Sequence, residues 1–268
     1  MNTVYINLVL ILLICVIVTL YIKNILCLEE FTVYNNFVYS NKLSRKDIYN
    51  LKRGQGIMTN MLKDFHNICI KNNITYFIWG GNLLGSQLYN GWIPWDGDVD
   101  LYVTRDDYNK LENILIKNPP INTWYQTLKT DPFYKRPPGN NNPLPNGKIR
   151  HLKSCYTKCQ DGVKWHNGLQ IDINTFQIVN NRIIFDTLNP AEIRIQKKIT
   201  SKDIYPLKLV KYDSIYVYIP NNPEKILDLH YTNKWRKMPP IRSRYPHEGN
   251  ISLSTCPHHY KLYPKLYN

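Results

Sequence analysis

Apolar residues recur at helical spacing from Arg45 to Lys71, a segment that is otherwise polar. The positions are Ile48, Leu51, Ile57, Met61, Leu62, Phe65, Ile68 and Cys69. This spacing places them on one face of a helix, which can then pack against a core. Gly54 and Gly56 weaken the first turns, and Asn72-Asn73 favours termination. The pattern predicts one long amphipathic helix.

The segments after this helix mix strand-like and helix-like patterns. β-branched and aromatic residues predict strands at Thr75–Trp79 and from about Asp98 to Val103. Further strands are predicted over 169–179, 182–185 and 208–219, and helices over 106–116, 190–199 and 223–231. Because strands and helices do not alternate strictly, the α+β class is favoured, with a mixed sheet flanked by helices.

Asp131–Lys148 interrupts this pattern. It holds five Pro, two Gly and four Asn in eighteen residues, a composition that disfavours both helix and central strand. We expect a long loop, either a disordered insertion or a mobile flap over a site.

Thr3–Ile22 is an apolar run of twenty residues without formal charge, and Asn7 is its only strongly polar residue. A helix of this length spans about 30 Å, the thickness of the hydrocarbon core of a bilayer. The run lacks the basic start and small-residue cleavage site of a signal peptide. The sequence therefore predicts an uncleaved, single-pass transmembrane anchor over 1–22, followed by a polar connector over 23–44.

The chain is basic, with 34 Lys and Arg against 20 Asp and Glu, a net charge of +14. This excess favours anionic partners, such as nucleic acid, phospholipid or a phosphorylated substrate. There is no block of like charges, zinc-finger spacing or RNA-recognition signature, so nucleic acid is not the expected partner. Among the six cysteines, Cys155 and Cys159 are the only close pair. They could form a disulfide, contribute half of a metal site with His151 or His166, or be free thiols.

The densest candidate for chemistry is Trp79–Val103, which reads WGGNLLGSQLYNGWIPWDGDVDLYV. Residues i and i+2 of a strand point to the same face, so Asp98 and Asp100 would present two carboxylates together. Close carboxylates repel, and a hard divalent cation such as Mg²⁺ or Mn²⁺ removes that repulsion. Asp96 is expected in a loop because Gly97 follows it.

A third carboxylate, Asp172, lies inside the apolar strand Ile171-Asp172-Ile173. A buried charge is costly unless it is paired or bound to a metal. If the two strands are neighbours, Asp172 reaches the Asp98–Asp100 pair. The alternative is a surface strand with outward aspartates, which a bare D-x-D motif alone would not exclude.

The segment GGNLLGSQLYNGWIPWDGDVDLYV resembles the signature of the LicD family, which includes bacterial phosphocholine transferases, fukutin and fukutin-related protein. NMLKDFHNICIKNNITYFIWGG, LQIDINTF and DIYPLKLVKYDSIYVYIPNNPEKILDLHY resemble further family segments in the same order. The resemblance covers about Ile48 to Pro240. It implies a nucleotidyltransferase-like fold over 45–254, with a C-terminal tail over 255–268.

The resemblance also implies an activity and its residues. The family transfers a phosphoalkyl group, such as phosphocholine or ribitol phosphate, from a CDP-linked donor to a glycan hydroxyl. The implied metal ligands and catalytic residues are Asp98, Asp100 and Asp172. The implied donor-phosphate loop consists of Gly80, Gly81, Asn82, Gly85 and Ser86. Basic side chains near the C-terminus, such as Arg242 and Arg244, are candidates for further phosphate contacts.

We therefore expect a membrane-anchored transferase that needs Mg²⁺ or Mn²⁺ and acts on a glycan or glycoconjugate. Its catalytic domain would be luminal in a eukaryotic host, although the charges flanking the anchor leave the orientation open. Two alternatives stay open. One is a nucleotidyltransferase that moves NMP from an NTP, and the other is an inactive relative that binds glycans or acts as a scaffold.

Overall fold

The computed structural model describes residues 32–34, 37–135, 144–156, 167–186 and 189–267. Its strands are β1 (Thr32–Tyr34), β2 (Phe37–Tyr39), β3 (Tyr76–Ile78), β4 (Val99–Thr104), β5 (Thr123–Gln126), β6 (Gly147–His151), β7 (Cys155–Tyr156), β8 (Gln170–Val179), β9 (Arg182–Phe185), β10 (Lys208–Tyr212), β11 (Ile215–Ile219) and β12 (Ile251–Ser252). Its helices are α2 (Arg45–Lys71), α3 (Gly80–Leu88), α4 (Arg105–Lys117), α5 (Pro190–Gln196), α6 (Ser201–Ile204), α7 (Pro223–Tyr231), α8 (Pro257–Leu262) and α9 (Pro264–Tyr267), with short 3₁₀ turns η1 (Thr232–Arg236) and η2 (Ile241–Ser243).

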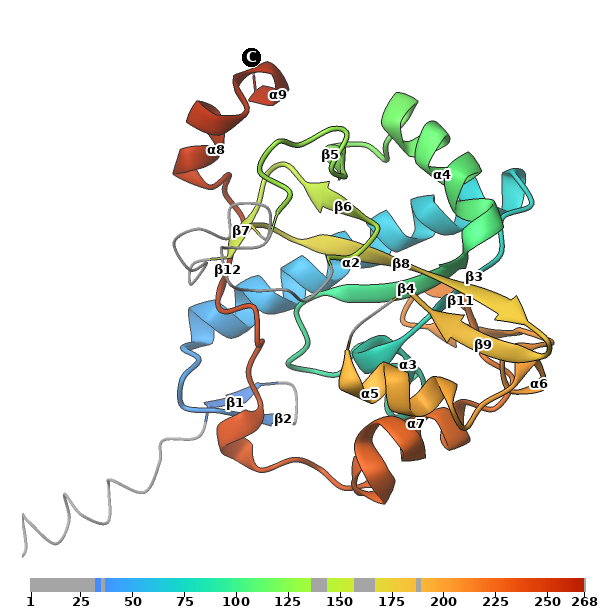
Figure 1. The fold of residues 1–268 in the computed structure, drawn as a ribbon. Coiled ribbons are helices and arrows are strands. Elements are labelled where there is room, and N and C mark those ends of the chain that lie inside the picture. Colours follow the sequence, from blue (N-terminus) through green and yellow to red (C-terminus); the bar gives the residue numbers. More distant parts are fainter. Residues whose placement is uncertain (1–31, 35–36, 136–143, 157–166, 187–188, 268) are drawn as a thin grey trace, which may run out of the picture.

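The centre of the molecule is a six-stranded mixed sheet (Figure 1). Five strands follow the order β3-β4-β8-β6-β5, and β9 pairs with β8. β4 and β8 are parallel, whereas the other pairs are antiparallel. The predicted class, a mixed sheet flanked by helices, is confirmed.

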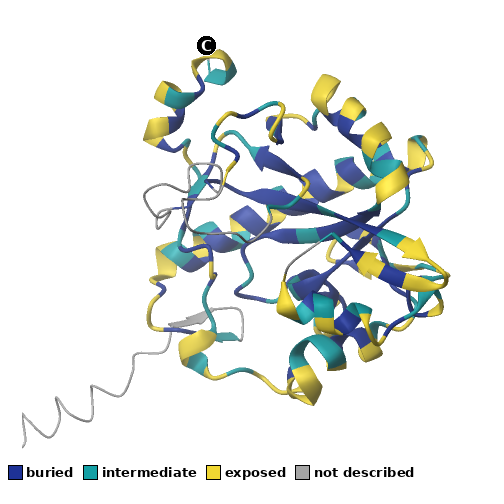
Figure 2. Ribbon diagram, in the orientation of Figure 1, coloured by how far each residue is buried: buried dark blue, intermediate teal, exposed yellow. Residues whose placement is uncertain are grey.

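The long predicted helix is α2, which begins and ends at the expected residues. Ser44 caps its start: the Ser44 side chain accepts from the Asp47 amide, and the Asp47 carboxylate accepts from the Ser44 amide. The apolar face of α2 is buried against the sheet, whereas its other face is exposed (Figure 2). Gly54 does not interrupt the helix, because its missing side chain lets Leu169 and Ile251 approach closely.

The two faces of the sheet carry different chemistry. Odd-numbered residues such as Val99, Leu101 and Ile171 are buried toward α2 and α4. Even-numbered residues of β4 and β8 point to the opposite face. The helices α3, α5 and α7 lie on that side of the sheet (Figure 1). The side-chain period of two thus separates an apolar core from a face that carries the aspartates.

Two expected loops contain regular secondary structure instead. The predicted loop Asp131–Lys148 ends in a strand: Gly147 and Lys148 begin β6, which lies between β8 and β5 inside the sheet. The polar residues Lys148 and Arg150 obscured this strand, because both are fully buried although charged side chains are usually exposed. The glycine-rich segment after Trp79, expected as a loop, is the helix α3.

The C-terminal segment is tied to β7, which forms a separate two-stranded sheet with β12. Cys155 of β7 forms a disulfide with Cys256, and β12 pairs with β7. The pairing with Cys256 was not predicted: Cys159, the partner considered for Cys155, lies outside the described residues, as does the predicted anchor Thr3–Ile22. The segment predicted as a tail carries α8 and α9, and His259 of α8 is fully buried. Across the described part of the chain, every helix is too short or too polar to cross a bilayer.

Candidate metal centre

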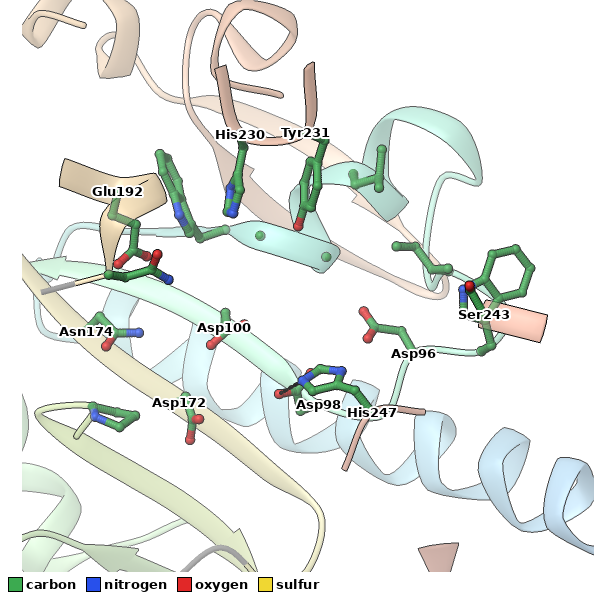
Figure 3. A pocket seen from close by; sticks show the side chains of 18 of the residues that line it. Asp96, Asp98, Asp100, Asp172, Asn174, Glu192, His230, Tyr231, Ser243 and His247 are labelled. Carbon is green, nitrogen blue, oxygen red and sulfur yellow. Dashed lines mark ion pairs between the residues drawn. The ribbon is translucent and has the colours of Figure 1, made fainter. Parts of the chain in front are cut away.

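The three aspartates predicted to bind a metal lie together on two parallel strands. Asp100 of β4 is the Cα partner of Asp172 of β8, and Asp98 directly precedes β4. Their side chains project from the same face of the sheet (Figure 3). One carboxylate oxygen from each residue lies within 4.8 Å of the others. The register of a single strand pair therefore assembles the cluster.

This cluster has the chemistry of a divalent-cation site. Desolvation, together with repulsion from Asp172, raises the pKa of Asp100 to about 8. Desolvation also raises the pKa of Asp98, and the nearby carboxylates of Glu248 and Asp100 raise it further. Asp98 and Asp100 therefore resist ionisation in the absence of a cation, and a hard, oxygen-liganded ion held by them and Asp172 would stabilise their charged forms. The residues present therefore fit Mg²⁺ or Mn²⁺.

Lys148 was not predicted to belong to this site, and it lies beside Asp172 in the row of side chains that begins with Asp100. It is the Cα partner of Asp172 on the side opposite Asp100, so Asp100, Asp172 and Lys148 are aligned across three strands. The Lys148 ammonium is fully buried and lies 2.6 Å from Asp172 Oδ1. Burial lowers the pKa of Lys148, while Asp172 opposes that change. This ion pair fixes the orientation of the third carboxylate.

A second group of side chains adjoins the first. Asp96, Asp98 and His247 also offer ligand atoms within 4.8 Å of one another. His247 forms an ion pair with the buried Glu248. Desolvation lowers the pKa of His247, but the ion pair and the nearby Asp96 outweigh it and raise the pKa to about 9. His247 has no metal-ligand spacing in the sequence, so only the fold could place it here.

The predicted donor-phosphate residues divide into two sets. Gly80 and Gly81 open α3 and line the cavity. Gly80 has a φ of +54°, and a Cβ there would lie 3.5 Å from Asp100 Oδ2. On Gly81 a Cβ would lie 2.6 Å from Asp96 Oδ2, so the two glycines allow the carboxylates to approach the backbone.

Asn82, Gly85 and Ser86 face away from the cavity. The buried Asn82 amide bonds to the backbone of Asp98 and Asp100. A Cβ on Gly85 would lie 2.3 Å from the Gly91 carbonyl oxygen, so this glycine serves close packing. The Ser86 hydroxyl donates to the Leu83 carbonyl. These contacts lie on the side of α3 away from the cavity and hold the helix in place.

The aspartates lie at the base of a cavity of about 880 Å³. Its lining combines acidic, aromatic and amide side chains with the start of α3: Trp79, Gly80, Gly81, Leu84, Ile93, Trp95, Asp96, Asp98, Asp100, Pro145, Asp172, Asn174, Asn189, Pro190, Glu192, His230, Tyr231, Ser243, Tyr245 and His247. Among the described residues no Lys or Arg lines it. Arg244 instead donates to the carbonyls of Val38 and Pro239. The net positive charge of the chain is therefore not concentrated here.

The fold and this acidic cavity define a mixed α/β protein with a candidate metal centre. Residues 73–222 match the family described as LicD/FKTN/FKRP, nucleotidyltransferase domain. Because the match covers more than half of the chain, the protein belongs to this family. The matched range contains all three aspartates of the cluster, as well as Lys148.

Individual relatives include one protein that carries the family's name. The chain is 34% identical over 76 residues to the lipopolysaccharide cholinephosphotransferase LicD of Haemophilus influenzae, covering 28% of this chain and 25% of that protein. An uncharacterised Rickettsia prowazekii protein is 27% identical over 199 residues, covering 73% of this chain and 62% of the relative. An uncharacterised Rickettsia typhi protein is 27% identical over 194 residues, covering 71% and 50%. The chain thus spans less than two thirds of the length of each of these relatives.

Proposed function

We propose that this protein is a metal-dependent transferase that moves a phosphoalkyl group from a CDP-linked donor to a hydroxyl of a glycan. The observation that carries the proposal is the convergence of Asp98, Asp100 and Asp172 at the base of the cavity. Family membership and the similarity to a cholinephosphotransferase support the reaction class. The nature of the donor alcohol and the acceptor is part of the proposal.

The side chains of the cavity have distinct roles in this reaction. Asp98, Asp100 and Asp172 would hold Mg²⁺ or Mn²⁺, which supplies positive charge for the donor pyrophosphate and the leaving CMP. Lys148 holds Asp172 in place. The start of α3 turns the positive end of its dipole, at Gly80 and Gly81, toward the same space, where backbone N–H groups can bind phosphate oxygens.

The acidic lining makes the metal essential in this mechanism. A pyrophosphate entering a cavity with clustered carboxylates and without Lys or Arg among the described lining residues would be repelled. In-line phosphoryl transfer depends mainly on positioning and charge stabilisation. These carboxylates therefore need a cation before the anionic donor can bind.

The disulfide supports an extracytoplasmic placement. Disulfides persist in oxidising compartments, and Cys155–Cys256 joins segments far apart in the sequence. Together with the apolar run Thr3–Ile22, it favours a membrane-anchored enzyme whose catalytic domain is luminal in a eukaryotic host. Non-reducing peptide mapping of the natural protein tests this placement.

Thermal-shift titration tests the reaction class. The full chain is mixed with Mg²⁺ and, separately, with CDP-alcohols, CTP, ATP and UDP-sugars. Stabilisation by CDP-alcohols only, and only with Mg²⁺, supports the proposal. Stabilisation by NTPs instead supports nucleotidyl transfer, and no response to any donor supports an inactive relative. Asp100→Asn should abolish both the response and phosphoalkyl transfer, whereas the surface variant Asp228→Asn should retain them.

A further inference from the structure

The cavity contains one carboxylate more than its metal-binding groups use. Among the described residues, four aspartates and His247 form the two groups of potential metal ligands that lie in this cavity. Glu192 of α5 also lines the cavity but belongs to neither group. Its carboxylate therefore needs a different explanation.

The strand register places Glu192 at a defined distance from the aspartates. Tyr102 and Asn174 are Cα partners, each two residues beyond Asp100 and Asp172. They project from the same face about 7 Å farther along the strands. The Tyr102 hydroxyl donates to Glu192 Oε1 at 2.7 Å. Glu192 thus lies one side-chain repeat beyond the metal cluster (Figure 3).

Glu192 has no counter-cation among the described residues. Its side chain is largely buried and forms none of the ion pairs found in the described part of the chain. Arg194 lies two positions away on α5, a spacing at which helical side chains do not face each other; it is exposed, and its charge acts on His230. A carboxylate held in this way by Tyr102 can accept a cation from the cavity.

The neighbouring rings suit an organic cation better than a metal. Trp79 and His230 both line this cavity and their ring centroids are 6.4 Å apart. Burial, and then the nearby charge of Arg194, lower the pKa of His230 to about 4, so this imidazole is neutral near pH 7 and does not itself repel a cation. Aromatic faces attract ammonium groups, and His230 is the more accessible of the two rings because Trp79 is only 2% exposed.

We propose that Glu192 is the specificity residue that binds an ammonium group of the transferred alcohol, so that the protein prefers a cationic aminoalcohol to a neutral polyol. The inference rests on the proposed function, because the donor phosphates must lie at Asp98, Asp100 and Asp172. A two-carbon chain between phosphate and ammonium has the length needed to reach from the aspartate row to the Tyr102–Glu192 row. A first-turn acid also suits the dipole of α5, but that alone does not explain why it lines the cavity.

The test compares donors that differ only in charge. Calorimetric dissociation constants are measured with Mg²⁺ for CDP-choline, for CDP-3,3-dimethylbutanol, in which carbon replaces the quaternary nitrogen, and for CDP-ribitol. The full chain is compared with Glu192→Gln, which keeps the size of the side chain and an oxygen for Tyr102. Glu224→Gln, a surface carboxylate on α7, is the matched control.

We expect the wild type and Glu224→Gln to bind CDP-choline at least about tenfold more tightly than its neutral isostere. In Glu192→Gln this ratio should fall close to one. A ratio near one in the wild type, a ratio unchanged by Glu192→Gln, or tightest binding of CDP-ribitol would overturn the assignment of Glu192 while leaving the proposed function intact. Binding of none of the three donors by the wild type would reject both.

Discussion

The side-chain oxygen of Asn82 accepts a hydrogen bond from the backbone amide of Asp100 at 2.7 Å. The side-chain nitrogen of Asn82 donates to the carbonyl of Asp98 at 3.1 Å and to the Tyr212 hydroxyl at 3.2 Å. One buried amide thus joins α3 to the backbone on both sides of Val99. Asn82 therefore holds the backbone of the predicted metal ligands, while the donor-phosphate role implied for it stays a prediction.

Asn82→Ala should therefore destabilise the fold and weaken metal binding. The substitution leaves the Asp100 N–H and the Asp98 carbonyl without their partner in a buried place, which costs about 1–3 kcal/mol. Urea unfolding and Mn²⁺ titration measure the two effects. Ser86→Ala, which removes a local hydrogen bond on the same helix, should change metal affinity little. If Asn82→Ala weakened only donor binding, the phosphate role would be supported.

Lys148→Met should make stability strongly dependent on a divalent cation. Removing one partner of a buried ion pair costs about 3–5 kcal/mol, because Asp172 would keep an uncompensated charge. Mg²⁺ can replace the lost positive charge, so the rise in Tm on adding Mg²⁺ should exceed that of the wild type.

Lys225→Met provides the control for Lys148. Lys225 pairs with Asp203 but is half exposed, so the pair is worth at most about 1 kcal/mol and lies outside the cavity. Its Mg²⁺-induced change in Tm should match the wild type. A smaller Mg²⁺ response in Lys148→Met than in the wild type would contradict the role assigned to Lys148.

Loss of the Cys155–Cys256 disulfide should loosen the segment that carries His247 and Glu248. The two cysteines are 101 residues apart, and removing a native disulfide typically costs about 2–5 kcal/mol. The double variant Cys155→Ser/Cys256→Ser should unfold at a lower urea concentration than the wild type. Adding a reductant should lower the urea midpoint of the wild type and leave that of the variant unchanged. A peptide map that links Cys155 to Cys159 would contradict the pairing.

Asp203 should make stability fall at acidic pH. Burial alone would raise its pKa, but hydrogen bonds from Asn222, Lys225 and the Thr200 amide lower it to about 2. Because the folded-state pKa lies below the usual value of about 3.9, the contribution to stability is present above about pH 4 and is lost as the pH falls toward 2. Asp203→Asn should weaken the pH dependence of the free energy of unfolding, measured with urea, between about pH 2 and pH 4. Equal slopes for the variant and the wild type would refute the linkage.

The sequence predicted the elements whose signals are local. The apolar period of α2 and the Asp98–Asp100 spacing depend on neighbours in the chain, and both were readable. Asp172 was recognisable as a candidate site residue because a charge inside an apolar strand is costly unless it is paired. Its position beside Asp100 then followed from a single strand pairing.

The missed features depend on contacts between distant segments. β6 was hidden because Lys148 is buried against Asp172, a pairing that no local pattern reveals. His247 reaches the cavity only because the C-terminal segment is held at β7. The glycines of α3 suggested a loop in the sequence. In the fold their small size instead allows close packing against the Gly91 carbonyl and the carboxylates of Asp96 and Asp100.

The alignment of Asp100, Asp172 and Lys148 across three strands also limits how the chain can change in length. Inserting or deleting one residue inside β4, β6 or β8 would turn the following side chains to the opposite face. One of these charges would then enter the apolar layer beneath α2. Homologous sequences should therefore differ in length within the connection between β5 and β6 and should keep residues 98–104 and 170–174 free of gaps.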